Sequence, residues 1–283
     1  MPLSPPPDLV LLPMIQRALD EDLGLGGDVT SMALIDADQQ ANAAIIARSA
    51  GRVAGLPCAR LCFAQIDDTV RFESVVADGA DVSAGEVVAR LSGPTRSLLA
   101  GERVALNFLG HLSGIATHTQ AMVTKLEGTK ARLCCTRKTL PGLRVVEKYA
   151  VRAGGGVNHR FGLGDAILIK DNHILAAGGV ENALKSARAH AGHMTRIEIE
   201  VDTLAQLNAA LPHKPDVIML DNMDIQILRQ AVVIIDNKVI SEASGGVSLQ
   251  TIAAIAATGV DMISTSAITM SAPALDLGLD FVS

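Results

Sequence analysis

Aromatic residues are nearly absent from this sequence of 283 residues, which has no Trp, one Tyr (Tyr149) and five Phe. The core must therefore be built from aliphatic side chains, and apolar residues, at 49% of the chain, are numerous enough to build one. The scarcity of aromatic rings counts against a base-stacking platform for single-stranded nucleic acid. A formal net charge of −6 likewise disfavours general binding to nucleic acid and other large polyanions.

The sequence also lacks long apolar runs and a basic leader. No run approaches the roughly 20 apolar residues that span a bilayer. The N-terminus, MPLSPPPDLV, has neither the basic start nor the apolar stretch of a signal peptide. These absences predict a soluble, cytoplasmic protein without a membrane partner.

Cysteines are few, and their spacing fits a reducing compartment. Cys134 and Cys135 are adjacent, so a disulfide between them would be strained. Cys58 and Cys62 are four residues apart and could form half of a metal site, but no second Cys or His pair has matching ligand spacing. We therefore expect all four to be buried structural thiols.

The first part of the chain predicts an α+β sandwich domain of antiparallel strands. An amphipathic pattern over 11–24 ends at Gly24 and predicts a helix, and residues 97–128 predict a long one. Strand-like runs bounded by glycines lie between them, together with one short helical run at 56–66. The strand-like runs cover 43–51, 69–79 and 85–93.

The second part predicts a parallel α/β barrel, incomplete and TIM-like. Six short apolar runs alternate with helical patterns, as strands buried on both faces do. They cover 131–136, 166–170, 196–201, 216–221, 239–244 and 261–266. We expect an N-terminal domain over 1–110, joined by the C-terminal segment 272–283, and a barrel domain over 111–271.

Five of the six predicted barrel strands end in a polar residue that is typical of a functional site. These are Lys170, Glu200, Asp221, Ser244 and Thr265. In a β/α barrel the carboxyl ends of the strands share one face, where active sites lie. Strand ends are polar wherever they leave a core, but that does not account for one lysine, two acids and a Ser-Gly-Gly at successive ends.

Positive charge is concentrated in the segment 130–173. It contains nine Lys or Arg and three acids, a net +6 in a chain whose total is −6. Such a local basin indicates a small polyanionic substrate. We interpret Arg144, Lys148 and Arg152, at spacing four, as a solvated helix face. The other candidate cations, Arg137, Lys138, Arg160 and Lys170, each lie at a strand end or in a glycine-rich loop.

Three motifs supply groups that suit such a substrate. CTRKTLPG (135–142) offers a forked guanidinium, an ammonium and hydroxyls for carboxylate or phosphate. Glu200 and Asp221 suit Mg²⁺ bound through a diphosphate, or a developing positive charge on a sugar, although ion pairs with lysines would also explain them. In EASGGV (242–247), backbone amides and the start of the following helix predict a phosphate site.

Taken together and in order, these motifs resemble the quinolinate phosphoribosyltransferase family. The resemblance extends from 21–31 to 271–280 and is most specific in GERVALNFLGHLSGIAT, TRKTLPGLRVVEKYAVRAGGGVNHR, LIKDNHI, MLDNM and EASGGV. It implies transfer of a phosphoribosyl group from phosphoribosyl pyrophosphate (PRPP) to quinolinate in NAD biosynthesis. Pyrophosphate and CO₂ would be released, and nicotinate mononucleotide formed.

The resemblance also implies a role for each matched residue. Thr136, Arg137, His159, Arg160 and Lys170 would bind quinolinate. Arg103 would complete the site of the partner subunit in a homodimer. Lys138 would hold a PRPP phosphate, and Glu200 and Asp221 would face the ribose hydroxyls and Mg²⁺, directly or through PRPP. Ser244, Gly245, Gly246, Ser264, Thr265, Ser266 and Ala267 would bind the 5′-phosphate. By the same resemblance, Lys138, Lys170, Glu200 and Asp221 would form the catalytic set, and no organic cofactor is implied.

One loop departs from the family pattern. Members commonly have SVGALT where this chain has STSAIT (264–269), so Thr265 and Ser266 replace Val and Gly. The Gly-to-Ser change narrows the loop but adds a hydroxyl that can bind phosphate.

Other functions remain open at this point. A paralogue of the same fold could use another acceptor, either nicotinate or that of a molybdenum-associated relative. A barrel aldolase could use Lys170 as a Schiff base. A non-catalytic anion-binding module is the third alternative. The intact TRKT, NHR and KDNH motifs favour quinolinate, because an acceptor with one carboxylate would not require so many cations.

Overall fold

The computed structural model describes residues 3–282, which form two compact units that interleave along the chain. The first contains the chain up to Gln120, Thr139–Gly155 and the segment from Ser271; the second contains Ala121–Lys138 and Gly156–Met270. The domain boundary expected after residue 110 stays a prediction. The two units are defined by packing, and each contains segments from separate parts of the chain.

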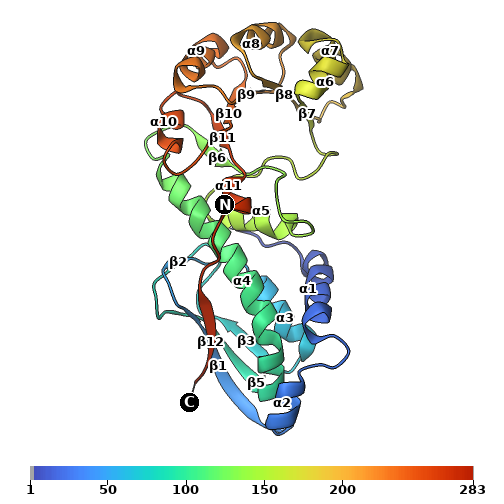
Figure 1. The fold of residues 1–283 in the computed structure, drawn as a ribbon, viewed down its shortest axis with the longest axis vertical. Helices are drawn as coiled ribbons and strands as arrows, with labels where there is room; N and C mark the ends of the chain where they lie inside the picture. The colour runs from blue at the N-terminus through green and yellow to red at the C-terminus, as the bar shows by residue number, and fades with distance from the viewer. Residues whose placement is uncertain (1–2, 283) are drawn as a thin grey trace. The chain divides into compact units, whose positions relative to one another are not determined.

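The first unit combines an antiparallel sheet with helices (Figure 1). Its helices are α1 (Asp8–Leu23), α2 (Val29–Leu34), α3 (Leu56–Ile66), α4 (Thr95–Thr124, which continues into the second unit) and α5 (Arg144–Ala153). Its strands are β1 (Gln40–Ala47), β2 (Gly51–Arg52), β3 (Arg71–Ser74), β4 (Asp81–Val82), β5 (Val87–Pro94) and β12 (Leu277–Val282). The main sheet has the order β12-β1-β5-β3, and β2 pairs with β4. The C-terminal strand therefore belongs to the N-terminal sheet, where it pairs antiparallel with β1.

Apolar spacing explains how this unit packs. α1 buries Leu11 and Ile15 and lies against α3, which buries Cys58, Cys62 and Phe63. Leu11 and Ile15, like Cys58 and Cys62, are four residues apart, which places each pair on one helix face. All four cysteines are buried, as expected, and none of them forms a disulfide. Burial, together with the charge of Asp78, raises the pKa of the Cys58 thiol to about 12.

A glycine on α4 allows the C-terminal segment to reach its sheet. A Cβ atom on Gly114 would lie 2.1 Å from the carbonyl oxygen of Pro273. Any side chain here would displace backbone, which cannot rotate away as a side chain can. Close packing against the C-terminal segment thus gives a reason for the glycine at position 114 of the motif LGHLSGIAT.

The second unit is a six-stranded parallel sheet with helices outside it (Figure 1). Its strands are β6 (Arg132–Cys134), β7 (Ile167–Ile169), β8 (Ile197–Val201), β9 (Val217–Asp221), β10 (Ile240–Ser244) and β11 (Met262–Ser264). Its helices are α6 (Asp171–Ala176), α7 (Val180–His190), α8 (Leu204–Ala210), the 3₁₀ turn Leu211–His213, α9 (Ile225–Ile235), α10 (Ile252–Ala256) and α11 (Ala267–Met270).

The strand order is β6-β11-β10-β9-β8-β7, and within the described chain β6 and β7 are edges that do not pair with each other. This confirms the predicted incomplete α/β barrel, and the first unit confirms the predicted α+β fold with antiparallel strands. Asp221, Ser244, Ser264 and Cys134 lie in one register across β9, β10, β11 and β6. The carboxyl ends of these strands therefore meet at one edge, as the sequence predicted.

Two expectations about helices are wrong. Lys148 does not lie on a solvated face, because α5 buries both Lys148 and Glu147 completely. The helix after the Ser-Gly-Gly begins only at Ile252, since residues 249–251 form a turn. Among helices of residues 3–282, none is both long and apolar enough to cross a membrane.

Candidate active site

Backbone pairing joins two cationic loops of the second unit. The Cys135 amide donates to the Val157 carbonyl at 3.1 Å, and the Val157 amide donates to the Leu133 carbonyl at 2.9 Å. After β6, the Thr136 hydroxyl accepts the Lys138 amide at 3.0 Å and closes a tight turn around Arg137. The TRK and NHR motifs, more than twenty residues apart in the sequence, are thus brought together.

Arg137 and Arg160 concentrate positive charge where these loops meet. Both are half-buried. Arg160 donates from Nη1 to the carbonyl of Ala166 at 2.8 Å. Burial lowers the pKa of Arg160, and the charge of Arg137 lowers it further. An anion with two carboxylates would offset both the desolvation and the repulsion.

Lys170 and Glu200 form an ion pair at the ends of β7 and β8. Lys170 Nζ lies 2.8 Å from Glu200 Oε2, with the lysine side chain 46% exposed and the glutamate side chain 11% exposed. The Lys170 amide donates to Nδ1 of His173 at 2.9 Å, which fixes the main chain where the lysine leaves the strand. The sequence left open whether Glu200 and Asp221 form ion pairs with lysines, and the structure shows such a pair for Glu200.

Asp221, at the end of β9, is linked to the glycine loop through its neighbour. Asn222 donates from Nδ2 to Asp221 Oδ2 at 2.5 Å and from its amide to the Ser244 carbonyl at 2.9 Å. Gly245 has φ +90°, and a Cβ atom there would lie 2.1 Å from Asn222 Oδ1. Asn222, which the sequence did not single out, thus defines the shape of this loop.

The glycine loop leaves its main chain open on one side. Gly246 has φ +61°, with nothing within 4 Å of a Cβ atom built on it. The Thr251 hydroxyl donates to the Gly246 carbonyl at 2.8 Å and closes the following turn. Because α10 begins later, the amides available to a phosphate are those of the loop itself.

In the loop after β11, some of the polar groups are already hydrogen-bonded within the protein. Ser264 and Thr265 are buried, at 2% and 8% exposure. The Thr265 amide donates to the Cys134 carbonyl at 3.1 Å, and its hydroxyl accepts the Ala267 amide at 3.1 Å. Ser266 and Ala267 are half-buried and closer to solvent.

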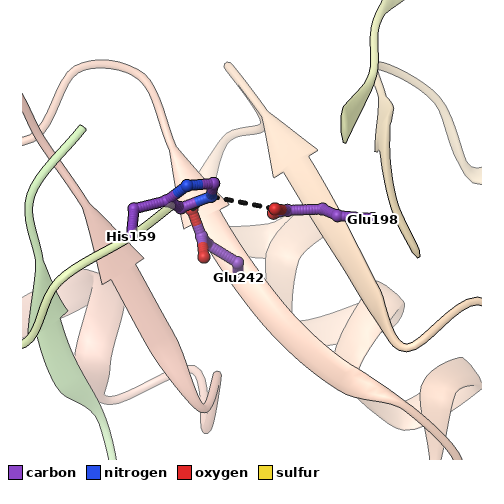
Figure 2. Close-up of side chains that lie close together, drawn as sticks. All are labelled: His159, Glu198 and Glu242. Atoms are coloured by element: carbon purple, nitrogen blue, oxygen red, sulfur yellow. Dashed lines mark ion pairs between the residues drawn. The ribbon is translucent and has the colours of Figure 1, made fainter. Parts of the chain in front are cut away.

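An unforeseen cluster lies inside the second unit. Figure 2 shows the His159 ring facing Glu198, with Glu242 beside it. His159 Nε2 lies 2.8 Å from Glu198 Oε2 and 3.8 Å from Glu242 Oε1. Both acids are almost fully buried. Burial and the charge of Glu198 raise the pKa of Glu242 to about 7, against the opposing effect of His159.

The only sequence signal for these two glutamates was an acid in an apolar strand, in IEIEV and in VISEAS. One oxygen of each carboxylate is buried without a hydrogen bond, and with His159 they form a group whose geometry could also hold a metal ion.

One predicted site residue lies elsewhere. Arg103 is exposed on α4, in the part of that helix that belongs to the first unit. Its proposed role across a dimer interface stays a prediction.

The sequence matches two family models that together cover most of the chain. Residues 28–113 match the N-terminal domain of quinolinate phosphoribosyl transferase, and residues 115–280 match its C-terminal domain.

Individual relatives match over nearly their whole length. A probable nicotinate-nucleotide pyrophosphorylase (carboxylating) of Bacillus subtilis is 44% identical, over 96% of this chain and 93% of that protein. The nicotinate-nucleotide pyrophosphorylase (carboxylating) of Mycobacterium leprae is 45% identical, over 94% of this chain and 95% of that one. The solved nicotinate-nucleotide pyrophosphorylase of Francisella tularensis superposes with a TM-score of 0.95 at 38% identity, covering 100% of this chain and 99% of that one.

Proposed function

Because this chain belongs to the quinolinate phosphoribosyltransferase family, we propose that it transfers the phosphoribosyl group of PRPP to quinolinate. Pyrophosphate and CO₂ are released and nicotinate mononucleotide is formed, a step of NAD biosynthesis. The enzyme is a pentosyltransferase, a nicotinate-nucleotide diphosphorylase of the carboxylating type. The observation that carries this assignment is the pair Arg137 and Arg160, half-buried and close enough for one charge to depress the pKa of the other.

The two guanidiniums match the two carboxylates of quinolinate. Arg137 and Arg160 each present a planar fork that suits a carboxylate. Thr136 and Lys170 stand at the ends of β6 and β7 and add a hydroxyl and an ammonium. An acceptor with a single carboxylate would engage only one of these two forks. This favours quinolinate over nicotinate.

PRPP is assigned to the other strand ends. Lys138 supplies an ammonium for a phosphate, and the loop after β10 supplies amides for the 5′-phosphate, with the 264–267 loop beside it in register. Glu200 and Asp221 carry the oxygen ligands that Mg²⁺ prefers and would hold it, directly or through PRPP. When bound, Mg²⁺ neutralises charge on the diphosphate.

The chemistry requires orientation and charge placement. As pyrophosphate departs, positive charge develops at C1 of the ribose, where Glu200 and Asp221 stabilise it. The pyridine nitrogen, held in position by the carboxylate contacts, attacks C1. As the C2–carboxylate bond breaks and CO₂ leaves, the positive ring nitrogen stabilises the electron pair left on C2, which then takes up a proton from solvent. No side chain forms a covalent bond to substrate.

Arg103 is assigned to the active site of a partner subunit, in a cytoplasmic homodimer. Arg103→Ala and Lys170→Ala proteins should each be inactive. Mixed after subunit exchange, they should regain activity, because a mixed dimer contains one site with both wild-type residues. No recovery, with exchange verified, would contradict a shared site.

The direct test supplies Mg²⁺, PRPP and quinolinate labelled in its C2 carboxylate. Labelled CO₂ and nicotinate mononucleotide, both dependent on PRPP, are expected. Product from nicotinate alone would point to a paralogue with another acceptor. Arg137→Ala should raise the quinolinate KM and leave the PRPP KM largely unchanged, and equal loss for both substrates would contradict the division of the site.

A further inference from the structure

The protonation state of His159 follows from its hydrogen bonds. The backbone amide of Arg160 donates to His159 Nδ1 at 2.9 Å. An amide can only donate, so Nδ1 must carry a lone pair and no proton. The proton of the neutral ring is then on Nε2, which faces Glu198 Oε2 at 2.8 Å. Both ring nitrogens are thus engaged within the protein.

The two buried glutamates stabilise this tautomer. Their side chains are 9% and 4% exposed, and one carboxylate oxygen of each lies within 4 Å of Nε2 (Figure 2). A carboxylate 2.8 Å from Nε2 favours a proton at that nitrogen, because it attracts the proton strongly at low dielectric, and Glu242 adds to this effect when it is ionised. A ring turned over about its axis would lose both the acceptor for the Arg160 amide and the donor for Glu198.

The cluster acts on Arg160 in two ways. First, His159 Nδ1 accepts the backbone amide of Arg160 and so holds the main chain of the residue that carries the guanidinium. Glu198 also favours the charged form of that guanidinium, against the opposing influence of Arg137. The site uses the same device a second time, because His173 Nδ1 accepts the backbone amide of Lys170.

We propose that Glu198 and Glu242 are positioning residues, which fix the His159 ring and, through its Nδ1, the main chain that aims Arg160 at a carboxylate of quinolinate. This inference rests on the proposed function for the identity of the anion. It assigns His159 to the protein framework, because a neutral ring that already donates from Nε2 has no further N–H group for a substrate.

The tautomer can be tested without substrate or turnover. The full chain would be labelled with ¹⁵N-histidine, and the His159 signals assigned by their loss in His159→Gln. We expect Nδ1 to have the shift of an unprotonated, hydrogen-bonded nitrogen and Nε2 that of a protonated one. A proton on Nδ1, alone or together with one on Nε2, would overturn the proposal.

Kinetics test the effect on Arg160. Glu198→Ala should raise the quinolinate KM about tenfold or more, as loss of a supporting hydrogen-bond partner does elsewhere, and leave the PRPP KM within about twofold. Glu198→Gln keeps a carbonyl oxygen that can accept the Nε2–H, so it should restore most of the affinity. Glu181→Gln, on the exposed face of α7, is the matched control and should change neither constant.

A double-mutant cycle separates a positioning role from direct contact. If Glu198 acts through His159, Glu198→Ala should add less than about twofold to the quinolinate KM of His159→Ala. Additive effects, or failure of Glu198→Gln to restore affinity, would overturn the proposal. A wild-type protein without activity on quinolinate would contradict the proposed function, whereas the ¹⁵N shifts would still decide the geometry.

Discussion

Replacing Gly245 with alanine should damage the loop after β10 for a reason that its neighbour does not share. Gly245 has φ +90°, and its added Cβ would lie 2.1 Å from Asn222 Oδ1 and 3.0 Å from the Asn222 amide nitrogen. The positive φ costs about 1 kcal/mol for any residue with a Cβ. Relieving the overlap moves Asn222 off Asp221 and adds about 1–3 kcal/mol, the usual cost of overpacking. We expect a total of about 2–4 kcal/mol in the free energy of unfolding.

Gly246→Ala is the matched control. Gly246 also has a positive φ, +61°, but nothing lies within 4 Å of its Cβ position. Its loss should be about 1 kcal/mol, from backbone strain alone. Urea unfolding of the two variants and the wild type measures the difference, and initial rates at varied PRPP test its effect on binding.

The comparison can refute the reasoning. Gly245→Ala should raise the PRPP KM more than Gly246→Ala does, because only the former displaces Asn222 and its contacts with Asp221 and Ser244. Equal stability for the two variants would mean that the Asn222 contact does not constrain the loop.

Three further predictions follow from buried groups. The pKa of Glu242 rises from 4.5 to about 7 on folding, so the folded state holds this proton more tightly than the unfolded state does. The resulting stability is fully present below pH 4.5, and about 3 kcal/mol of it is lost as the pH rises to 7. Glu242→Gln should therefore make the free energy of unfolding in urea depend less on pH between pH 5 and pH 8. The Cys58 and Cys62 thiols, whose pKa values are raised by burial, should react with a disulfide reagent only after unfolding, and fast labelling of the native protein would contradict their burial. Tyr149 donates to Asp78 at 2.6 Å, so Tyr149→Phe should lower the free energy of unfolding by about 1–3 kcal/mol. An unchanged free energy of unfolding would contradict this and would mean that Asp78 finds another donor.

The sequence predicted most of the barrel because its strands have one physical signature. Continuous apolar runs such as DVIMLD and AILIK are required where both faces of a parallel sheet are covered, and each became a strand. The polar residue after each run then had to emerge at one edge. The ion pair of Lys170 with Glu200 agrees with this rule, but the sequence offered it only as one of two explanations for the acids.

Other features depend on contacts that no local pattern encodes. Lys148 has the spacing of a surface residue, yet α5 buries it, because burial depends on which other segments cover that face. Glu198 and Glu242 lie in strands whose apolar neighbours gave no indication of a partner, and only the path of the 156–162 loop brings His159 between them. Asn222 became visible only through its fit to Gly245, more than twenty residues away.

The acids of the second unit explain how a cationic site is stable before its substrates arrive. Lys170 is paired with Glu200, and Glu198 partly offsets the repulsion between Arg137 and Arg160. Under the proposed function, Lys170 must turn from Glu200 to a carboxylate of quinolinate, which frees Glu200 to face the ribose of PRPP. One ion pair thus serves as a stabilising contact in the free protein and supplies a group to each substrate in the complex. Because Lys170 is assigned to quinolinate and Glu200 to PRPP, removing Lys170 should raise mainly the quinolinate KM, and removing Glu200 should raise mainly the PRPP KM.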